Sequence, residues 1–97
     1  MCLQRLITLA TPTLAIALRS DDPDLYNDRG DFYVKLGSLD EALSAYEKAI
    51  SLNRDYALGH SNRGWVLAIK EEHADAITAY GEALRIVHFQ VFVIMEL

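Results

Sequence analysis

The chain has 97 residues, of which 52% are hydrophobic and 24% charged, and its formal net charge is −5. A chain of this size forms one small domain with enough apolar residues for a packed core, which argues against a large catalytic domain and against intrinsic disorder. The acidic residues leave no basic stripe for nucleic acid, and the single cysteine, Cys2, rules out an internal disulfide and a zinc cluster of several thiolates.

The first 18 residues, MCLQRLITLATPTLAIAL, have features that resemble a secretory signal peptide. They are apolar, contain Arg5, and include an Ala-x-Ala pattern at 15–17. Pro12 interrupts the run, however, and no segment reaches the roughly 20 continuous apolar residues that a membrane-spanning helix needs. We therefore expect a cytoplasmic protein, and the alternative is an exported protein from which residues 1–17 are removed.

Residues 23–36 are predicted to form a helix. Three residues recur at spacings of four and three and therefore share one helix face: Tyr26, Gly30 and Tyr33. Asp22 suits the N-cap, and Pro23 suits the first helical position, where no backbone donor is required. Gly37 can adopt the left-handed conformation that ends a helix. Both boundaries of this helix are therefore predicted from local signals.

A second helix is predicted to begin at Ser38. Ser38 and Glu41 have the spacing of a capping box, in which each side chain accepts a hydrogen bond from the other residue's backbone amide. The predicted buried face consists of Leu39, Ala42, Leu43, Tyr46, Ala49 and Ile50. The two alanines permit close helix approach, and Gly30 leaves room on the facing helix for Tyr46. We expect these two helices to pack as a hairpin.

The sequence then repeats itself at a fixed offset of 34 residues. The identical pairs are Arg29/Arg63, Gly30/Gly64, Ala42/Ala76, Ala45/Ala79, Tyr46/Tyr80 and Ala49/Ala83. The conservative pairs are Leu43/Ile77, Ile50/Leu84 and Leu52/Ile86. A period of 20 to 50 residues is typical of stacked repeats. We therefore expect two hairpins, at about residues 23–56 and 57–90.

The second copy lacks two local signals of the first. Glu71 and Glu72 replace Gly37 and Ser38, so a left-handed turn there costs about 1 kcal/mol relative to glycine. Gly81 lies inside the second helix of this copy and weakens it by roughly 1 kcal/mol. The second hairpin is therefore expected to be the less stable one.

Residues 91–97 are expected to continue the last helix as an apolar tail. With the residues just before them they present Phe89, Val91, Phe92, Val93, Ile94 and Met95. The outer face of a repeat stack is normally polar, so exposed residues of this kind favour self-association. The alternative is that the chain is a shortened version of a longer array.

The paired helices resemble the tetratricopeptide repeat, which has a glycine in its first helix and an Ala-x-x-x-aromatic-x-x-Ala signature in its second. The residues that match are Gly30, Tyr33, Ala42, Tyr46 and Ala49, then Gly64, Ala76, Tyr80 and Ala83. The resemblance covers residues 23–90 and implies an all-α fold of antiparallel helical hairpins stacked as a short right-handed solenoid. The usual tryptophan and proline of the repeat are replaced by Tyr26 and His60, and by Arg54 and His88.

Residues 1–20 gain a second interpretation from the same signature. Ala10, Leu14 and Ala17 reproduce its spacing, so residues 3–19 are interpreted as a degenerate half repeat or capping helix that covers the first hairpin. Pro12 would break or kink that helix unless a fresh helix begins there. The signal peptide remains the alternative.

Nothing in the sequence indicates catalysis. His60, His73 and His88 stand at wide, irregular spacings, unlike the ligands of a metal site. A glycine-rich phosphate loop and a serine or cysteine nucleophile motif are both missing from the sequence. We predict that the chain is not an enzyme and requires no cofactor or metal.

The resemblance implies a concave groove, lined by the first helix of each hairpin, that binds peptides or extended segments. The residues expected there are Asn27, Asp31, Val34, Lys35, Ser61, Asn62, Trp65 and Ile69. Some members of the family bind a C-terminal carboxylate through basic residues at these positions, whereas this chain has Asn27, Asp31, Ser61 and Trp65 there. We therefore expect a partner segment that is basic or apolar.

Trp65 is the preferred contact residue because tryptophan is enriched among binding hot spots. Alternatively, it packs against its neighbours or the apolar tail. The sequence thus predicts an adaptor or scaffold for a protein or peptide partner, with no nucleic acid. The alternatives are a docking segment of a larger multidomain enzyme or scaffold, and an exported repeat protein.

Overall fold

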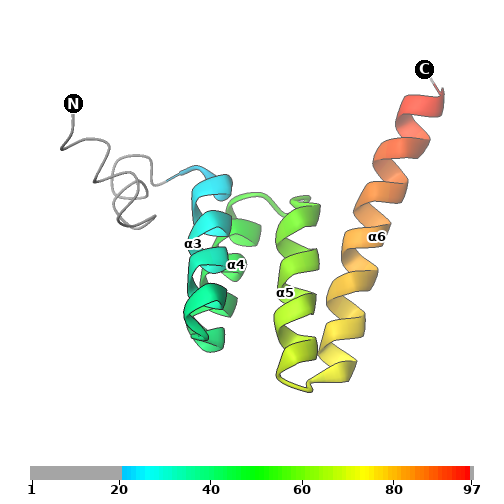
Figure 1. Ribbon diagram of the computed structural model, residues 1–97. Coiled ribbons are helices and arrows are strands. Elements are labelled where there is room, and N and C mark those ends of the chain that lie inside the picture. Colours follow the sequence, from blue (N-terminus) through cyan, green and yellow to red (C-terminus); the bar gives the residue numbers. More distant parts are fainter. Residues whose placement is uncertain (1–20, 97) are drawn as a thin grey trace, which may run out of the picture.

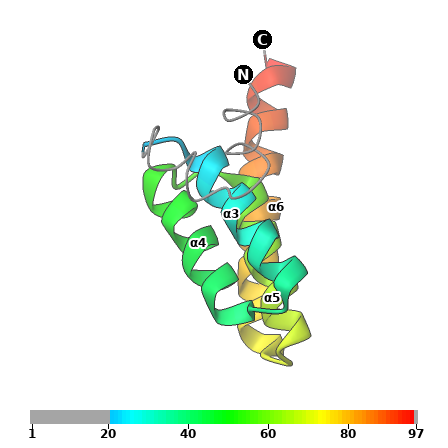
Figure 2. The same ribbon diagram turned by 60° about the vertical axis from the view of Figure 1, so that its left-hand side comes forward.

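The computed structural model describes residues 21–96, and this part of the chain is all α-helical. Its helices are α3 (Pro23–Leu36), α4 (Leu39–Leu52), α5 (Ala57–Ile69) and α6 (His73–Glu96). In both views they follow one another as two hairpins, α3 with α4 and α5 with α6 (Figures 1 and 2). The predicted all-α fold is confirmed, whereas the predictions for residues 1–20 and for residue 97 lie outside the described residues.

The boundaries of α3 agree with the prediction. The Asp22 carboxylate accepts a hydrogen bond of 2.9 Å from the Asp24 amide, and Pro23 occupies the first turn. Gly37 ends the helix at a φ of 77°. The Ser38 amide then donates to the Tyr33 carbonyl at 2.9 Å, which closes the last turn.

The predicted capping box at Ser38 is wrong. Ser38 precedes α4, but its side chain makes no capping hydrogen bond. A capping box requires the Ser38 amide to donate to the Glu41 side chain, and that amide is already used by the Tyr33 carbonyl of the preceding helix. Only Gly37 and Ser38 lie between the two helices, so the end of α3 and the start of α4 compete for the same backbone donor.

The core of the first hairpin centres on Tyr46. Its side chain is fully buried, together with Ala42 and Ala49. A Cβ atom built on Gly30 would lie 2.6 Å from the Tyr46 Cδ1 atom, so the glycine leaves the space that the ring occupies. The buried face is shifted from the prediction. Ala45 belongs to it, while Leu39, Leu43 and Ile50 are only half-buried.

The second hairpin has a similar core with a looser fit. The buried residues of α6 are Ala76, Ala79, Ala83 and Ile86. A Cβ atom on Gly64 would lie 3.1 Å from the Tyr80 ring, which is itself half-buried. Glu71 has a φ of 64° in the turn between the helices, as the offset from Gly37 predicts. This turn therefore contains the left-handed conformation without the glycine that favours it.

Helix α5 packs across the first hairpin. Val66 is fully buried against the cluster of Ala42 and Tyr46. Arg63 reaches Glu47 on α4 at 3.4 Å, and Lys70 pairs with Asp40. Arg63 thus bridges α5 and α4.

Arg29, the equivalent of Arg63 in the first hairpin, makes a different contact. Within residues 21–96, its hydrogen-bond partner is not an acid on a neighbouring helix. Its Nη2 atom donates to the hydroxyl oxygen of Tyr33, on the same helix, at 3.1 Å.

Candidate functional site

The first helices of the two hairpins, α3 and α5, carry the predicted binding residues. The 34-residue offset makes Asp28 equivalent to Asn62, Asp31 to Trp65, and Lys35 to Ile69. We call the surface formed by Asp24, Asp28, Asp31 and Lys35 on α3 and by Asn62, Trp65 and Ile69 on α5 the α3–α5 face. The two helices contribute side chains of very different chemistry to it.

Four of the eight predicted binding residues, Asn62 among them, make contacts within the fold. Asn27 is only 3% exposed, and its side-chain oxygen accepts a hydrogen bond of 2.9 Å from the Asn62 amide group. This bond satisfies a buried polar group and joins α3 to α5. Val34 packs against the Tyr46 cluster. Asp31 accepts a hydrogen bond of 2.5 Å from the Tyr46 hydroxyl.

The hydrogen bond between Tyr46 and Asp31 also affects the tyrosine. Burial of the ring, followed by the hydrogen bond to the Asp31 carboxylate, raises the pKa of Tyr46 well above its usual value. The hydroxyl therefore remains a proton donor at any physiological pH. The Tyr46 hydroxyl holds the Asp31 side chain in place by donating to one of its carboxylate oxygens.

The remaining predicted residues differ in where they lie. Lys35, Trp65 and Ile69 are exposed, and the exposed fraction of Trp65 is 48%. Ser61 lies on another side of α5, where it lines a hollow shared with α6. The α3–α5 face thus retains an exposed tryptophan and an exposed isoleucine on α5.

The α3 side of the face is acidic. Asp24, Asp28 and Asp31 recur at spacings of four and three, which places them along one side of the helix. Partial burial, and then repulsion from Asp31, Asp24 and Asp22, raises the pKa of Asp28 above its ordinary value. The negative charges therefore disfavour one another, and a cation placed among them would relieve this repulsion.

Sequence reasoning missed Asp24 and Asp28 as members of this face. The Asp24 carboxylate also accepts a hydrogen bond of 2.6 Å from the Tyr56 hydroxyl, which ties the start of α5 to α3. The spacing of the two residues relative to Asp31 was a signal that could have identified them.

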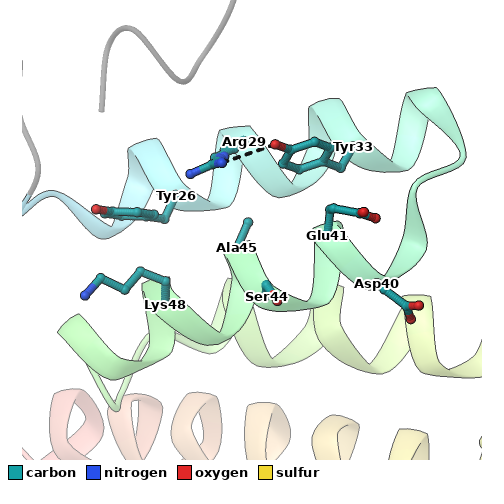
Figure 3. A pocket seen from close by; sticks show the side chains of 8 residues that line it. All are labelled: Tyr26, Arg29, Tyr33, Asp40, Glu41, Ser44, Ala45 and Lys48. Atoms are coloured by element: carbon teal, nitrogen blue, oxygen red, sulfur yellow. Dashed lines mark hydrogen bonds between the residues drawn. The ribbon is translucent and has the colours of Figure 1, made fainter. Parts of the chain in front are cut away.

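A separate hollow of about 350 Å³ lies between α3 and α4 (Figure 3). Its lining residues are Tyr26, Arg29, Tyr33, Asp40, Glu41, Ser44, Ala45 and Lys48. The Arg29 guanidinium lies 5.4 Å from the centre of the Tyr33 ring, and the Lys48 ammonium lies 5.8 Å from that of Tyr26. None of the eight predicted partner-binding residues lines this hollow.

Comparisons with known proteins agree with this architecture. A family model described as TPR repeat matches residues 30–70. Hsp70-Hsp90 organizing protein 2 of Arabidopsis thaliana is 35% identical over 72 residues, which are 74% of this chain and 13% of that protein. The chain thus spans only a small part of the length of this relative.

Two solved structures are similar in fold. The crystal structure of MamA matches with a TM-score of 0.79 and 28% sequence identity, over 82% of this chain and 47% of that one. The second TPR of Spaghetti (RPAP3), bound to the HSP90 peptide SRMEEVD, matches with a TM-score of 0.73 and 23% identity, over 86% and 75%. Together with the 34-residue period and the helical hairpins, these matches show that the chain belongs to the tetratricopeptide repeat family.

Proposed function

We propose that this chain is a non-enzymatic protein-interaction module whose α3–α5 face binds an extended segment of a partner protein. The observation that carries the proposal is the combination of acidic side chains on α3 with exposed Trp65 and Ile69 on α5. A segment that places a lysine or arginine near Asp28 and an apolar side chain on Trp65 matches both halves. Such a segment is the proposed ligand.

The relatives support the class of ligand but not its charge. The RPAP3 domain is bound to a peptide, SRMEEVD, in which three of the last four residues are acidic. In this chain the α3 side of the α3–α5 face is itself acidic, so an acidic peptide would meet like charges there. The proposal therefore keeps the binding of an extended peptide and reverses the preferred charge.

The charge preference is tested with three labelled peptides and fluorescence anisotropy. The first peptide alternates lysine with leucine, the second has glutamate in place of each lysine, and the third is SRMEEVD. We expect the first to bind, with an affinity that falls as salt is added, and the other two to bind at least tenfold more weakly. Equal binding of the basic and acidic peptides would refute the proposal.

The site is tested with matched aromatic substitutions. Trp65→Ala is expected to weaken binding of the basic peptide by about thirtyfold, as for a binding hot spot. Phe92→Ala removes another exposed aromatic side chain, on α6 and away from the α3–α5 face, and is expected to leave the affinity unchanged. If both variants bind as the wild type does, or weaken to the same extent, the α3–α5 face is not the binding site.

A wider assembly role follows from the same face. The matching relative is much longer than this chain, which covers 13% of it. We propose that, within a longer scaffold protein, this chain is the docking segment and binds the partner through its α3–α5 face. Fusion of residues 21–96 to an unrelated carrier should then transfer binding of the basic peptide to that carrier, and a carrier that fails to bind would argue against this role.

A further inference from the structure

Helix α6 exposes a continuous apolar stripe beside the face that packs on α5. Its members are Ile77, Tyr80, Leu84, Val87, Val91 and Ile94, and we call them the α6 stripe. Ile77, Leu84 and Ile94 are about 70% exposed, at 71%, 70% and 69%. The spacings alternate between three and four residues throughout, which is the pattern of a helix that packs along another helix.

The face of α6 that contacts α5 is formed by other residues. Ala76, Ala79, Ala83 and Ile86 are buried there, and none of them belongs to the α6 stripe. Tyr80 packs with its half-buried ring against Gly64, and the other members of the stripe are not part of the hairpin core. The exposure of the stripe in the structure means that a second helix can reach it without disturbing the packing of α5 on α6.

The α6 stripe borders an apolar hollow of about 510 Å³ between α5 and α6. The hollow is lined by Leu58 and Ser61 from α5 and by Tyr80, Leu84 and Val87 from α6, among others. The equivalents of Ser61, Tyr80 and Leu84 in the first hairpin are Asn27, Tyr46 and Ile50.

Those equivalents show what kind of element the hollow accepts. In the first hairpin, Asn27 and Tyr46 are buried, and α5 lies over this side of the hairpin, where its Asn62 bonds to Asn27. The second hairpin presents the same kind of surface with no helix of residues 21–96 on it. A helix is therefore the element that this surface is shaped to accept.

We propose that a second copy of this chain covers the α6 stripe, with the two α6 helices packed antiparallel about a twofold axis. The stripe reads with the same spacings in both directions, since 77 and 94, 80 and 91, and 84 and 87 have the same sum. In an antiparallel pair, Ile77 faces Ile94 of the partner subunit and Leu84 faces Val87 of the partner subunit. One surface is thus complementary to itself, as a twofold interface requires.

Charge supports the choice of a second copy. The chain carries a net charge of −5, so two copies repel each other wherever their acids meet. No Asp, Glu, Lys or Arg lies in the stripe or at the positions beside it, which are Ala76, Gly81, Ala83, His88, Gln90 and Met95. Two stripes can therefore meet without bringing like charges together.

The length of α6 supports the antiparallel orientation. Helix α6 has 24 residues and α5 has 13, and the C-terminal turns of α6 project beyond the N-terminal end of α5 (Figure 1). In the antiparallel pair, this projecting half lies on the half of the partner's α6 that belongs to its hairpin. Each copy therefore covers the projecting residues of the other, and the apolar stripe is buried along its whole length.

The first test compares the mass of the chain in solution for matched substitutions. Sedimentation velocity is expected to show a dimer for the wild type and a monomer for Leu84→Asp. The dissociation constant should rise at least about a hundredfold, because each dimer would bury two aspartates. Phe89→Asp is the control. Phe89 lies two residues from both Val87 and Val91, on the opposite side of the helix, so this variant should remain a dimer.

Several outcomes would overturn the proposal. A wild-type chain that stays monomeric at about 100 µM would do so, and so would equal loss of association in Leu84→Asp and Phe89→Asp, because that result indicates unspecific apolar aggregation. Leu84 is exposed, so circular dichroism should show the same helix content in Leu84→Asp as in the wild type.

A membrane is the remaining alternative for this surface. Residues His73–Met95 are long and apolar enough to cross a bilayer by length and composition alone, although Asp75, Glu82 and Arg85 interrupt the apolar run. The first half of α6 packs on α5, however, which favours a protein surface. A monomeric wild type that sediments with phosphatidylcholine vesicles would show that the α6 stripe faces lipid, and the proposal would then be wrong.

The second test determines orientation by cross-linking. Ile77→Cys and Ile94→Cys are prepared separately in a Cys2→Ser background and mixed under mild oxidation. The antiparallel pair predicts a disulfide between the two different variants and none within either one, because two copies of position 77 lie roughly 26 Å apart along the axis. Disulfides within each variant, and none between them, would show a parallel pair and refute the proposed orientation.

Discussion

Four glycines lie inside the helices of residues 21–96, and for three of them the structure predicts a different result when each is changed to alanine. Gly30 faces the buried ring of Tyr46, Gly64 faces the half-buried ring of Tyr80, and Gly81 has no other group within 4 Å of the Cβ position. All three substitutions add one methyl group and the same gain in helix propensity. The differences among them therefore report the space beside each glycine.

The magnitude for Gly30→Ala follows from the Tyr46 ring. The new Cβ would lie 2.6 Å from Cδ1 and 2.8 Å from Cζ, and the ring cannot move away because it is fully buried and its hydroxyl is bonded to Asp31. Overpacking of this kind costs about 3 kcal/mol, and the helix propensity gained from alanine offsets about 1 kcal/mol. The free energy of unfolding should fall by about 2 kcal/mol.

The other two substitutions serve as controls. The Tyr80 ring lies 3.1 Å from the Cβ position of Gly64 and can shift, so Gly64→Ala should remain within about 0.5 kcal/mol of the wild type. Gly81→Ala meets nothing and should raise the free energy of unfolding by about 0.5 to 1 kcal/mol.

Urea unfolding followed by circular dichroism measures all three variants against the wild type. The protein concentration must be the same in each experiment, because association changes apparent stability. The expected order of stability is Gly81→Ala, then wild type and Gly64→Ala, then Gly30→Ala. If Gly30→Ala is as stable as Gly64→Ala, the close fit between Gly30 and Tyr46 does not determine the stability of the first hairpin.

Three further substitutions test individual contacts. Glu71→Gly should raise the melting temperature by several degrees, as calorimetry would show, because it removes about 1 kcal/mol of strain at a φ of 64°. Tyr46→Phe should lower the free energy of unfolding by about 1 to 2 kcal/mol in urea titrations, because the Asp31 carboxylate loses its donor. Asp28→Asn should raise the free energy of unfolding at pH 7, because the pKa of Asp28 is raised in the folded state. This gain persists above the raised pKa and disappears below the unfolded-state value of 3.8, which urea titrations at pH 7 and pH 3 would show.

The parts of the fold that could be predicted depend on local signals or on the repeat itself. Asp22, Pro23 and Gly37 determine the boundaries of α3 through groups only a few residues apart. The fit of Tyr46 against Gly30 follows from the same pairing at Tyr80 and Gly64, because two copies of one contact are visible in the sequence. The left-handed residue at Glu71 was predictable for the same reason.

The parts that could not be predicted depend on competition between distant groups. The Ser38 amide can donate to Tyr33 or to Glu41, and the spacing of the capping box does not show which acceptor is closer. The burial of Asn27 depends on Asn62, 35 residues later in the chain. Its position on the first helix suggested a binding residue, whereas the packing of α5 makes it a contact between helices.

The two proposed surfaces lie on different sides of the second hairpin, and this separates their effects. Trp65 belongs to the α3–α5 face, while Leu84 lines the hollow between α5 and α6, to which Trp65 does not contribute. Trp65→Ala should therefore leave the dimer intact, and Leu84→Asp should leave the affinity for a soluble, monovalent peptide unchanged. On a surface coated densely with the same peptide, the dimer can bind two peptides at once and gains avidity. Leu84→Asp should therefore reduce retention of the protein on that surface by about tenfold or more. Loss of monovalent affinity in Leu84→Asp would instead show that the second hairpin requires the dimer to present Trp65.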